Sequence, residues 1–186
     1  YKEILWDSPF YLVKFWISIL LSVLIVIGQL FVSVTAGYAF AKFEFWGRDV
    51  LFFIVITVMM MPYQVTLVSN YIVLDGMGLI GTYAALVLPA VFSPFGVFLM
   101  RQMISAMPTD TIEAARLDGA GELRILWKIV LPYSKSGVTA LVVLSFIDSW
   151  NMVEQPIVFL NNPYRYPLSI FLSQVSANNP GAVFAC

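Results

Sequence analysis

Three long stretches without a single charged residue constrain this sequence more than any other feature. They cover residues 15–41, 50–74 and 76–100. A helix needs about 20 apolar residues to cross the roughly 30 Å hydrocarbon core of a bilayer. Each stretch is therefore long enough to form one transmembrane helix, and the third helix is expected to begin near Thr82, after a glycine-rich segment.

A fourth membrane span is predicted between residues 133 and 156. This segment is apolar as far as Ile147 and then carries Asp148 and Glu154. The composition agrees with a membrane protein, because 60% of the residues are hydrophobic and 11% are charged, whereas about 25% are charged in an ordinary soluble domain. The predicted fold is all-α: a polytopic membrane helix bundle with about four transmembrane helices, in a single domain that covers residues 1–186.

Several kinds of site are excluded by what the sequence lacks. It contains no histidine, and Cys186 is its one cysteine, which rules out serine–histidine and cysteine–histidine catalysis, histidine metal sites and a disulfide within the chain. The net charge of −1 argues against nucleic-acid binding. No GxxxxGK(S/T) phosphate loop occurs, and the GxGxxG spacing at Gly76, Gly78 and Gly81 does not follow a predicted strand. We therefore expect no catalytic residue, no metal and no cofactor.

The basic residues predict how the spans are oriented. The first connection carries Lys42 and Arg48, the connection around Asp75 carries no base, and the long connection 101–132 carries four. Because lysine and arginine favour the cytoplasmic side of a membrane, the first and third connections are expected in the cytoplasm, and residues 157–186 are expected to form an outer loop. Both chain ends then lie outside, which favours a domain that crosses the membrane several times and is truncated at both ends.

The connection 101–132 is long enough to have a structure of its own. Asp110 is predicted to cap a short helix, with Glu113 three residues later as in a capping box. Gly119 is suited to a left-handed helix end, and a second helix is expected from about Gly121. Its apolar face would comprise Leu123, Leu126, Trp127 and Val130.

Small side chains flank this glycine turn, namely Ala114, Ala115 and Ala120. They would allow a partner to approach closely, so one interpretation of the segment is a docking element. The other interpretation is an amphipathic linker that rests on the bilayer surface. The residue pattern alone leaves both interpretations open.

The string EAARLDGAGELRILWKIVLP, residues 113–132, resembles the EAA motif of permeases from binding-protein-dependent ABC importers. Further segments resemble the carbohydrate-uptake, maltose-type branch of these permeases, among them GYAFAKFEFWGRD, MMMPYQVTLVSNY, FGVFLMRQ and SWN. The similarity covers nearly the whole sequence. The positions that match the EAA motif are Glu113, Ala114, Ala115, Asp118, Gly119, Ala120, Ile129, Leu131 and Pro132.

The resemblance implies the type I ABC importer permease fold in a bacterial plasma (inner) membrane, with six spans of which spans two to five lie in this sequence. It implies that the EAA segment is a coupling helix in a groove of a separate ATPase subunit, which hydrolyses the ATP. Glu113 would be a polar contact or capping anchor, Ala114 and Ala115 would form the packing face, and Asp118 and Gly119 would shape the turn. The implied partners are ABC ATPase subunits, a second permease subunit in a heterodimer, an extracytoplasmic solute-binding protein, a sugar substrate and membrane lipid.

Two clusters are candidates for the translocation path. Met60, Pro62 and Gln64 lie in the middle of the second span, where the proline would break the helix. Discontinuous helices often mark substrate sites in transporters, and ordinary core packing is the alternative. Trp150 and Asn151 lie in the outer part of the fourth span, where interfacial anchoring is the alternative.

Two other functions are left open by the sequence. The chain could be a membrane scaffold that holds a cytoplasmic partner without transporting anything. It could also be an intramembrane enzyme, although no convincing pair of nucleophile and base is evident. A small-xxx-small spacing at Ser33, Gly37 and Ala41 predicts that the first span packs closely against another helix.

Overall fold

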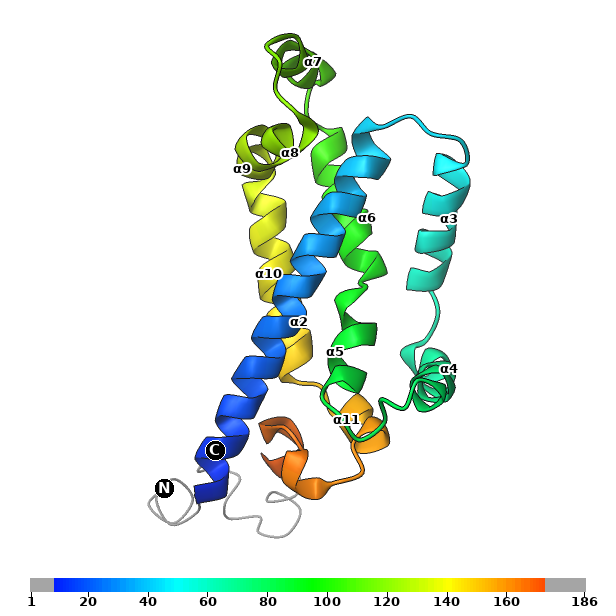
Figure 1. Cartoon of the computed structure of the whole chain (residues 1–186), viewed down its shortest axis with the longest axis vertical. Coiled ribbons are helices and arrows are strands. Elements are labelled where there is room, and N and C mark those ends of the chain that lie inside the picture. Colours follow the sequence, from blue (N-terminus) through cyan, green and yellow to red (C-terminus); the bar gives the residue numbers. More distant parts are fainter. Residues whose placement is uncertain (1–8, 173–186) are drawn as a thin grey trace. The chain divides into compact units, whose positions relative to one another are not determined.

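The computed structural model describes residues 9–172, which form helices joined by short connections (Figure 1). No strand occurs within that range, so the all-α prediction is confirmed there. The elements are α2 (Pro9–Lys42), α3 (Arg48–Met59), α4 (Tyr63–Gly76), α5 (Ala84–Val91), α6 (Pro94–Ser105), α7 (Thr109–Leu117), α8 (Glu122–Ile125), a π-helical turn (Leu126–Val130), α9 (Leu131–Tyr133), α10 (Lys135–Trp150), α11 (Glu154–Phe159) and a 3₁₀ turn (Pro163–Arg165).

Two helical stretches are long and apolar enough to cross a membrane, Tyr11–Lys42 and Ala84–Ser105. Two bent pairs of helices, α3 with α4 and the segment Glu122–Tyr133 with α10, meet the same test only if each pair is counted as one span. The predicted number of four is reached on that count. The second predicted span is interrupted between Met59 and Tyr63, as expected from Pro62, because a proline inside a helix removes a hydrogen bond and clashes with the preceding turn.

The fourth predicted span is wrong at its outer end. It was expected to reach residue 156, but α10 ends at Trp150 and a new helix starts at Glu154. The backbone N–H of Asn151 makes the last α-helical bond, to the carbonyl oxygen of Ile147 at 3.0 Å. The side-chain Nδ2 of Asn151 donates to the same oxygen at 2.9 Å, as side chains do at helix ends, so Asn151 marks the end of α10.

The chain divides into two compact units. We call residues 27–62 and 91–144 unit A, and residues 1–26, 63–90 and 145–186 unit B. Unit A contains the end of α2, the helices α3 and α6 to α9, and the start of α10. Unit B contains the start of α2, the helices α4, α5 and α11, and the end of α10.

In unit A, α2 packs tightly against α6. A Cβ atom placed on Gly37 would lie 2.7 Å from the Cβ of Met100 and 2.9 Å from the backbone nitrogen of Arg101. On the facing helix, a Cβ on Gly96 would overlap the side chain of Ser33. The close packing predicted from the small-xxx-small spacing is therefore confirmed. The core beside this contact comprises Val34, Tyr38, Met100, Ile104, Met107, Ile112, Ile125, Leu126, Val130 and Leu141.

Replacing Gly37 with alanine is expected to destabilise unit A, because a backbone atom on α6 cannot move aside as a side chain could. Overpacking of this kind costs about 1–3 kcal/mol, which corresponds to a fall of roughly 2–10 °C in melting temperature. The matched control is Gly76→Ala, where no atom lies within 4 Å of the added Cβ. Thermal unfolding of the two detergent-solubilised variants should separate them, and equal melting temperatures would contradict the close contact.

In unit B, the start of α2 is bonded to the segment that follows α11. Lys14, which is buried, donates from Nζ to the carbonyl oxygens of Pro163 and Tyr166, at 3.2 and 3.3 Å. The Oγ of Ser18 accepts from the backbone N–H of Leu168 at 2.8 Å. The predicted outer loop 157–186 therefore begins as an ordered segment, and its residues 173–186, with Cys186, lie outside the described part.

The GxGxxG segment forms a turn between two helices. It follows α4, and Gly78 and Gly81 have positive φ angles of 68° and 82°. The N–H of Gly81 donates to the carbonyl oxygen of Phe159 at 2.7 Å, and its own carbonyl oxygen accepts from Nη1 of Arg165 at 2.7 Å. These glycines therefore shape a connection inside unit B, and a helix rather than a strand precedes them.

Candidate functional site: the glycine turn between α7 and α8

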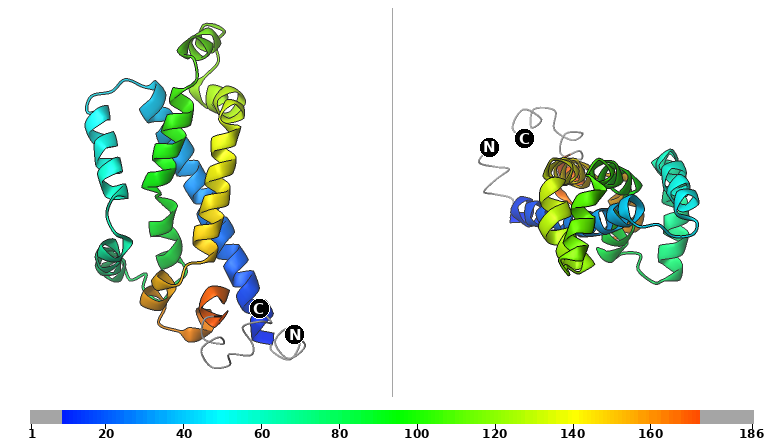
Figure 2. Two further views of the ribbon diagram at one scale, coloured as in Figure 1. Left: turned by 180° about the vertical axis from the view of Figure 1, so that it is seen from behind. Right: turned by 90° about the horizontal axis from the view of Figure 1, so that it is seen from above.

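The segment with the EAA string forms two short helices at one end of unit A, beyond the ends of α6 and α2 (Figures 1 and 2). Gly119 lies between them with φ +80°. The N–H of Ala120 donates to Ala115 O and the N–H of Gly119 donates to Arg116 O, both at 3.0 Å. This pair of bonds is the Schellman motif, which needs a left-handed residue after the helix. The predicted glycine turn is confirmed.

The predicted start of α7 is wrong by two residues, because Asp110 was expected at the N-cap position, and the predicted capping box is wrong as well. The helix begins at Thr109, Pro108 occupies the N-cap position with an extended ψ of 131°, and no side chain bonds the first N–H groups. Asp110 instead lies within the first turn, where the helix dipole favours a carboxylate. Glu113 is exposed and makes no capping bond at the start of the helix.

α7 has one face toward unit A and one face away from it. Ile112 is 1% exposed and packs in the core, and Ala115 lies half-buried against the same core. Glu113, Ala114 and Leu117 are exposed on the other side of the helix, and Leu117 is 89% exposed. The two alanines of the EAA string thus lie on different faces. Of the other predicted site residues, Asp118 and Gly119 are exposed and Ala120 is half-buried.

A carboxylate at the start of α8 joins three helices. Glu122 Oε2 accepts from the Tyr38 hydroxyl of α2 at 2.6 Å, and Glu122 Oε1 accepts from Nε of Arg116 in the last turn of α7 at 2.7 Å. The Arg116 guanidinium beside Glu122 lowers the pKa of that carboxyl below its ordinary value. Tyr38 is only 4% exposed. We call these residues the Tyr38–Glu122–Arg116 cluster.

Sequence reasoning missed this cluster. Glu122 follows Arg116 by six residues across a glycine turn, which is not a helical i, i+4 spacing, and Tyr38 lies 84 residues earlier in the chain. The one available signal was an acidic residue in the first turn of a predicted helix, and such residues are common for reasons of the helix dipole alone.

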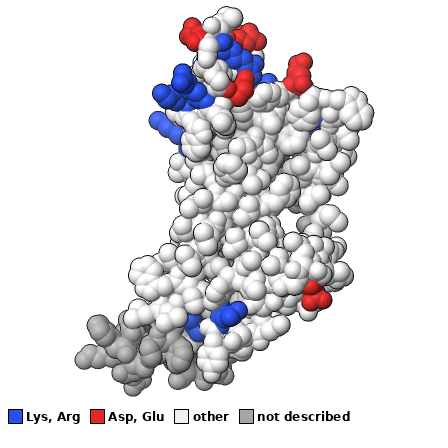
Figure 3. All heavy atoms as spheres, viewed as in Figure 1, with Lys and Arg blue, Asp and Glu red and all other residues white. Residues whose placement is uncertain are grey.

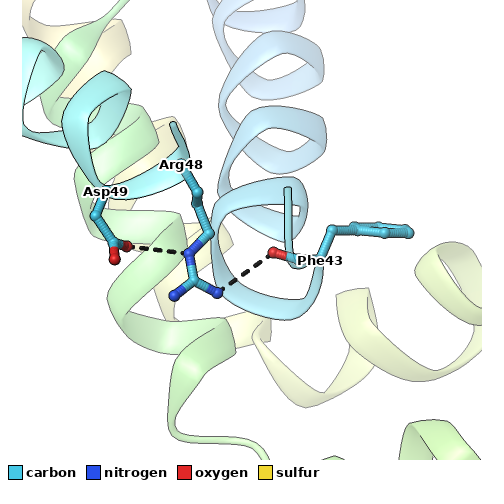
Figure 4. Close-up of polar contacts among 3 residues, drawn as sticks. All are labelled: Phe43, Arg48 and Asp49. Carbon is cyan, nitrogen blue, oxygen red and sulfur yellow. Dashed lines mark hydrogen bonds and ion pairs between the residues drawn. The ribbon is translucent and has the colours of Figure 1, made fainter. Parts of the chain in front are cut away.

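The connection between α2 and α3 packs beside the same helices. The ring of Phe43 lies edge-on to Tyr38, with 5.3 Å between the centroids, and the Arg116 guanidinium is 5.7 Å from the Phe43 ring. The Phe43 carbonyl accepts from Arg48 Nη1 at 3.4 Å, while Arg48 Nε pairs with Asp49 at 3.0 Å (Figure 4). Lys42 donates to the carbonyl oxygen of Met107, before α7, at 2.6 Å. The end of α2 is therefore tied to the segment on both sides of α7.

The second helix begins after Gly121, as predicted, but its apolar face is wrong in part. Leu126 and Val130 are buried, whereas Leu123 and Trp127 are 73% and 63% exposed. The buried face instead includes Ile125, which is 0% exposed, so it is turned away from Leu123 and Trp127 along the helix that continues into the π-helical turn at Leu126–Val130. The exposed pair lines an apolar groove of about 120 Å³ together with Leu30, Phe31, Val34, Thr35, Leu126 and Leu131.

Charged side chains gather at this end of unit A (Figure 3). Seven of the ten basic residues of the sequence belong to unit A. Among residues 9–172, no three His, Cys, Asp or Glu side chains lie close enough together to hold a metal ion.

The residues predicted for a translocation path fall in both units. Met60, 78% exposed, and Pro62 lie at the break after α3 in unit A. In unit B, Gln64 Nε2 donates to Glu154 Oε1 at 3.4 Å. Also in unit B, Trp150 packs edge-on against Phe15 and stacks on Phe146, with centroids 5.8 and 5.7 Å apart, next to the helix-terminating Asn151. The structure thus brings Gln64 to an acidic partner, Glu154, from the predicted fourth span.

Comparison with known proteins identifies the family. A family model described as "Binding-protein-dependent transport system inner membrane component" matches residues 29–186. The arabinooligosaccharides transport system permease protein AraQ of Halalkalibacterium halodurans is 32% identical over 167 residues, which are 90% of this chain and 60% of AraQ. The sn-glycerol-3-phosphate transport system permease protein UgpE of Yersinia pestis is 35% identical over 145 residues, 78% of this chain and 52% of UgpE.

The fold has a solved counterpart. One chain in the crystal structure of a bacterial ABC transporter involved in the import of the acidic polysaccharide alginate superimposes with a TM-score of 0.84 at 24% identity, and the match covers 96% of this chain and 65% of that one. The chain thus spans a little over half to two thirds of the length of these relatives. The match of the family model over residues 29–186 decides the assignment: the chain belongs to the family of inner membrane components of binding-protein-dependent transport systems.

Proposed function

We propose that this chain is the transmembrane permease subunit of an ATP-driven ABC importer for sugars or oligosaccharides. The observation that carries the proposal is the helix–Schellman turn–helix at residues 109–125, because it puts the EAA string on an exposed helix at the charged end of unit A. The names of two relatives support a carbohydrate substrate, because they refer to arabinooligosaccharides and to the polysaccharide alginate. On this proposal ATP is hydrolysed on a separate chain.

The connection 101–132 is the proposed coupling loop, and it faces the cytoplasm. Its orientation is supported by the basic residues of unit A, because lysine and arginine are retained on the cytoplasmic side. The exposed face of α7, with Glu113 and Ala114, contacts an ABC ATPase subunit. Ala115 and Ala120 pack this element on unit A, and the Asp118–Gly119 turn sets its direction.

The remaining partners follow from the same assignment. A second permease subunit completes a heterodimer that lines one pathway, and an extracytoplasmic solute-binding protein delivers the sugar on the side of residues 157–186. Met60, Pro62, Gln64, Trp150 and Asn151 are proposed to line the path. The bond between Gln64 and Glu154 supports this assignment in unit B, since amide and carboxylate groups are the partners that sugar hydroxyls need.

Purification of the intact protein from its native membrane tests the proposal. A tagged copy should bring along an ABC ATPase subunit and a second, different permease, both identified by mass spectrometry, and the complex should hydrolyse ATP. Recovery of an untagged second copy of the same chain, in place of a different permease, would show that the transporter contains a homodimer and not the proposed heterodimer. Reproducible recovery of the protein without any ATPase would favour a scaffold and overturn the proposal.

A further inference from the structure

We propose that the Glu122 carboxylate, held by Tyr38 and Arg116, is the positioning group that passes movement of α7 to the membrane helix α2. The inference rests on the proposed function and deepens it, because it names the residues through which the coupling loop acts. Arg116 and Glu122 lie within the string 113–132 but are not among its positions that match the EAA motif, and Tyr38 lies outside the string. All three lie in unit A, so the contacts belong to one compact body.

The Tyr38–Glu122–Arg116 cluster connects helices that are distant in the sequence. α7 and α8 are joined by the glycine turn, and α2 is far away in sequence. The carboxylate of Glu122, the first residue of α8, bonds to Arg116 in the last turn of α7 and to Tyr38 near the end of α2. A displacement of α7 therefore reaches α2 through two short hydrogen bonds.

The two hydrogen bonds of the Glu122 carboxylate are short and strong. At 2.6 and 2.7 Å, both are in the range of charge-assisted bonds, which are roughly twice as strong as bonds between neutral groups. The Arg116–Glu122 ion pair is partly solvated, with 38% and 42% of the side chains exposed, and surface pairs of this kind contribute little by themselves. The buried Tyr38 hydroxyl makes the difference, because it fixes one oxygen of the carboxylate to the core.

Tightly packed apolar residues support the Tyr38–Glu122–Arg116 cluster. The Tyr38 ring packs edge-on against Phe43, and Phe43 in turn lies under the Arg116 guanidinium. Tyr38, Ile112 and Ile125, one residue from each of the three helices, belong to the same core cluster. The polar bonds thus have an apolar support on the membrane side and a solvated side on which α7 is exposed.

The test is the amount of sugar carried per ATP hydrolysed by the complete transporter in liposomes. Tyr38→Phe removes one hydroxyl and keeps the ring, and Glu122→Gln keeps the shape and removes the charge. Each variant is expected to keep its ATPase subunit and its ATP hydrolysis, while sugar carried per ATP falls roughly tenfold, as expected for the loss of one hydrogen bond to a charged group. The double variant should be no worse than the poorer single variant, because both remove the same link.

The matched control is Asp49→Asn, which breaks another ion pair of unit A. Asp49 pairs with Arg48, is 77% exposed and lies outside the Tyr38–Glu122–Arg116 cluster. This variant is expected to transport as the unchanged protein does.

Three results would overturn the inference. The first is an unchanged ratio of sugar to ATP in Tyr38→Phe and Glu122→Gln. The second is loss of the ATPase subunit from Tyr38→Phe, the mildest change, because the hydroxyl would then serve assembly rather than coupling. The third is an equal loss of coupling in Asp49→Asn. A failure of the proposed function itself looks different, since the unchanged transporter would then show no ATP-driven uptake at all.

Discussion

Replacing Gly119 with valine should abolish most of the transport while leaving the protein in the membrane. Gly119 has φ +80°, a conformation that costs an L-residue about 1–2 kcal/mol and is worst for β-branched side chains. No atom lies within 4 Å of a Cβ added there, so the variant meets no clash and the strain falls on the turn alone. We expect substrate uptake to fall about tenfold or more, since 1.4 kcal/mol corresponds to a factor of ten.

The control for this prediction is two residues away. Gly121 also has nothing within 4 Å of an added Cβ, but its φ is −72°, which any residue adopts without strain. Gly121→Val should therefore transport nearly as well as the unchanged protein. The measurement is uptake normalised to the amount of each variant in the membrane. If both variants lose uptake equally, or neither does, the left-handed turn is not what matters.

Replacing Leu117 with aspartate should detach the ATPase subunit. Leu117 is 89% exposed in the last turn of α7, next to the glycine turn. Burial of this side chain by the ATPase subunit would explain why a leucine occupies such an exposed position. Burial of one leucine contributes about 1.5–3 kcal/mol, and a buried unpaired carboxylate costs more. We expect at least a tenfold loss of co-purifying ATPase subunit.

Thr111 supplies the control on the same helix. It is exposed too, and at about 100° per residue it lies about 120° around the helix from Leu117. Thr111→Asp adds the same charge to α7 on a side that faces away from Glu113 and Leu117, and it should retain the ATPase subunit. Retention of the subunit by Leu117→Asp would contradict the assignment of this face, whatever Thr111→Asp does.

The helical fold was predictable from the sequence because the signals are local. Absence of charge over 25 residues marks a span, Pro62 marks a break and Gly119 marks a left-handed turn, and each is a property of neighbouring residues. Two errors in the connection arose from the same local reasoning. Asp110 fits a cap by type, but Pro108 already supplies the extended residue before the helix, and the predicted apolar face included Leu123 where the buried face includes Ile125.

The Tyr38–Glu122–Arg116 cluster could not be predicted in this way. It depends on the tertiary packing of α2 against α6, which places a tyrosine next to an acid 84 residues later. Periodicity indicates which face of a helix is buried, but not which polar group on another helix it meets. The exposed face of α7 could be predicted only in part. The EAA string indicated the segment, but only the structure shows that Ala114 is exposed and that Ala115 packs inward.

The central claim is that α7 docks on an ATPase subunit, and cross-linking tests it most directly. In a Cys186→Ser background, which removes the one cysteine of the sequence, a single cysteine at Leu117 would carry a photoreactive maleimide in the assembled transporter. A second variant would carry the probe at Trp46, which is 99% exposed in the α2–α3 connection. The account predicts an adduct with the ATPase subunit from position 117 that far exceeds the adduct from position 46. Absence of an ATPase adduct from position 117, in a complex that contains the subunit, would contradict it.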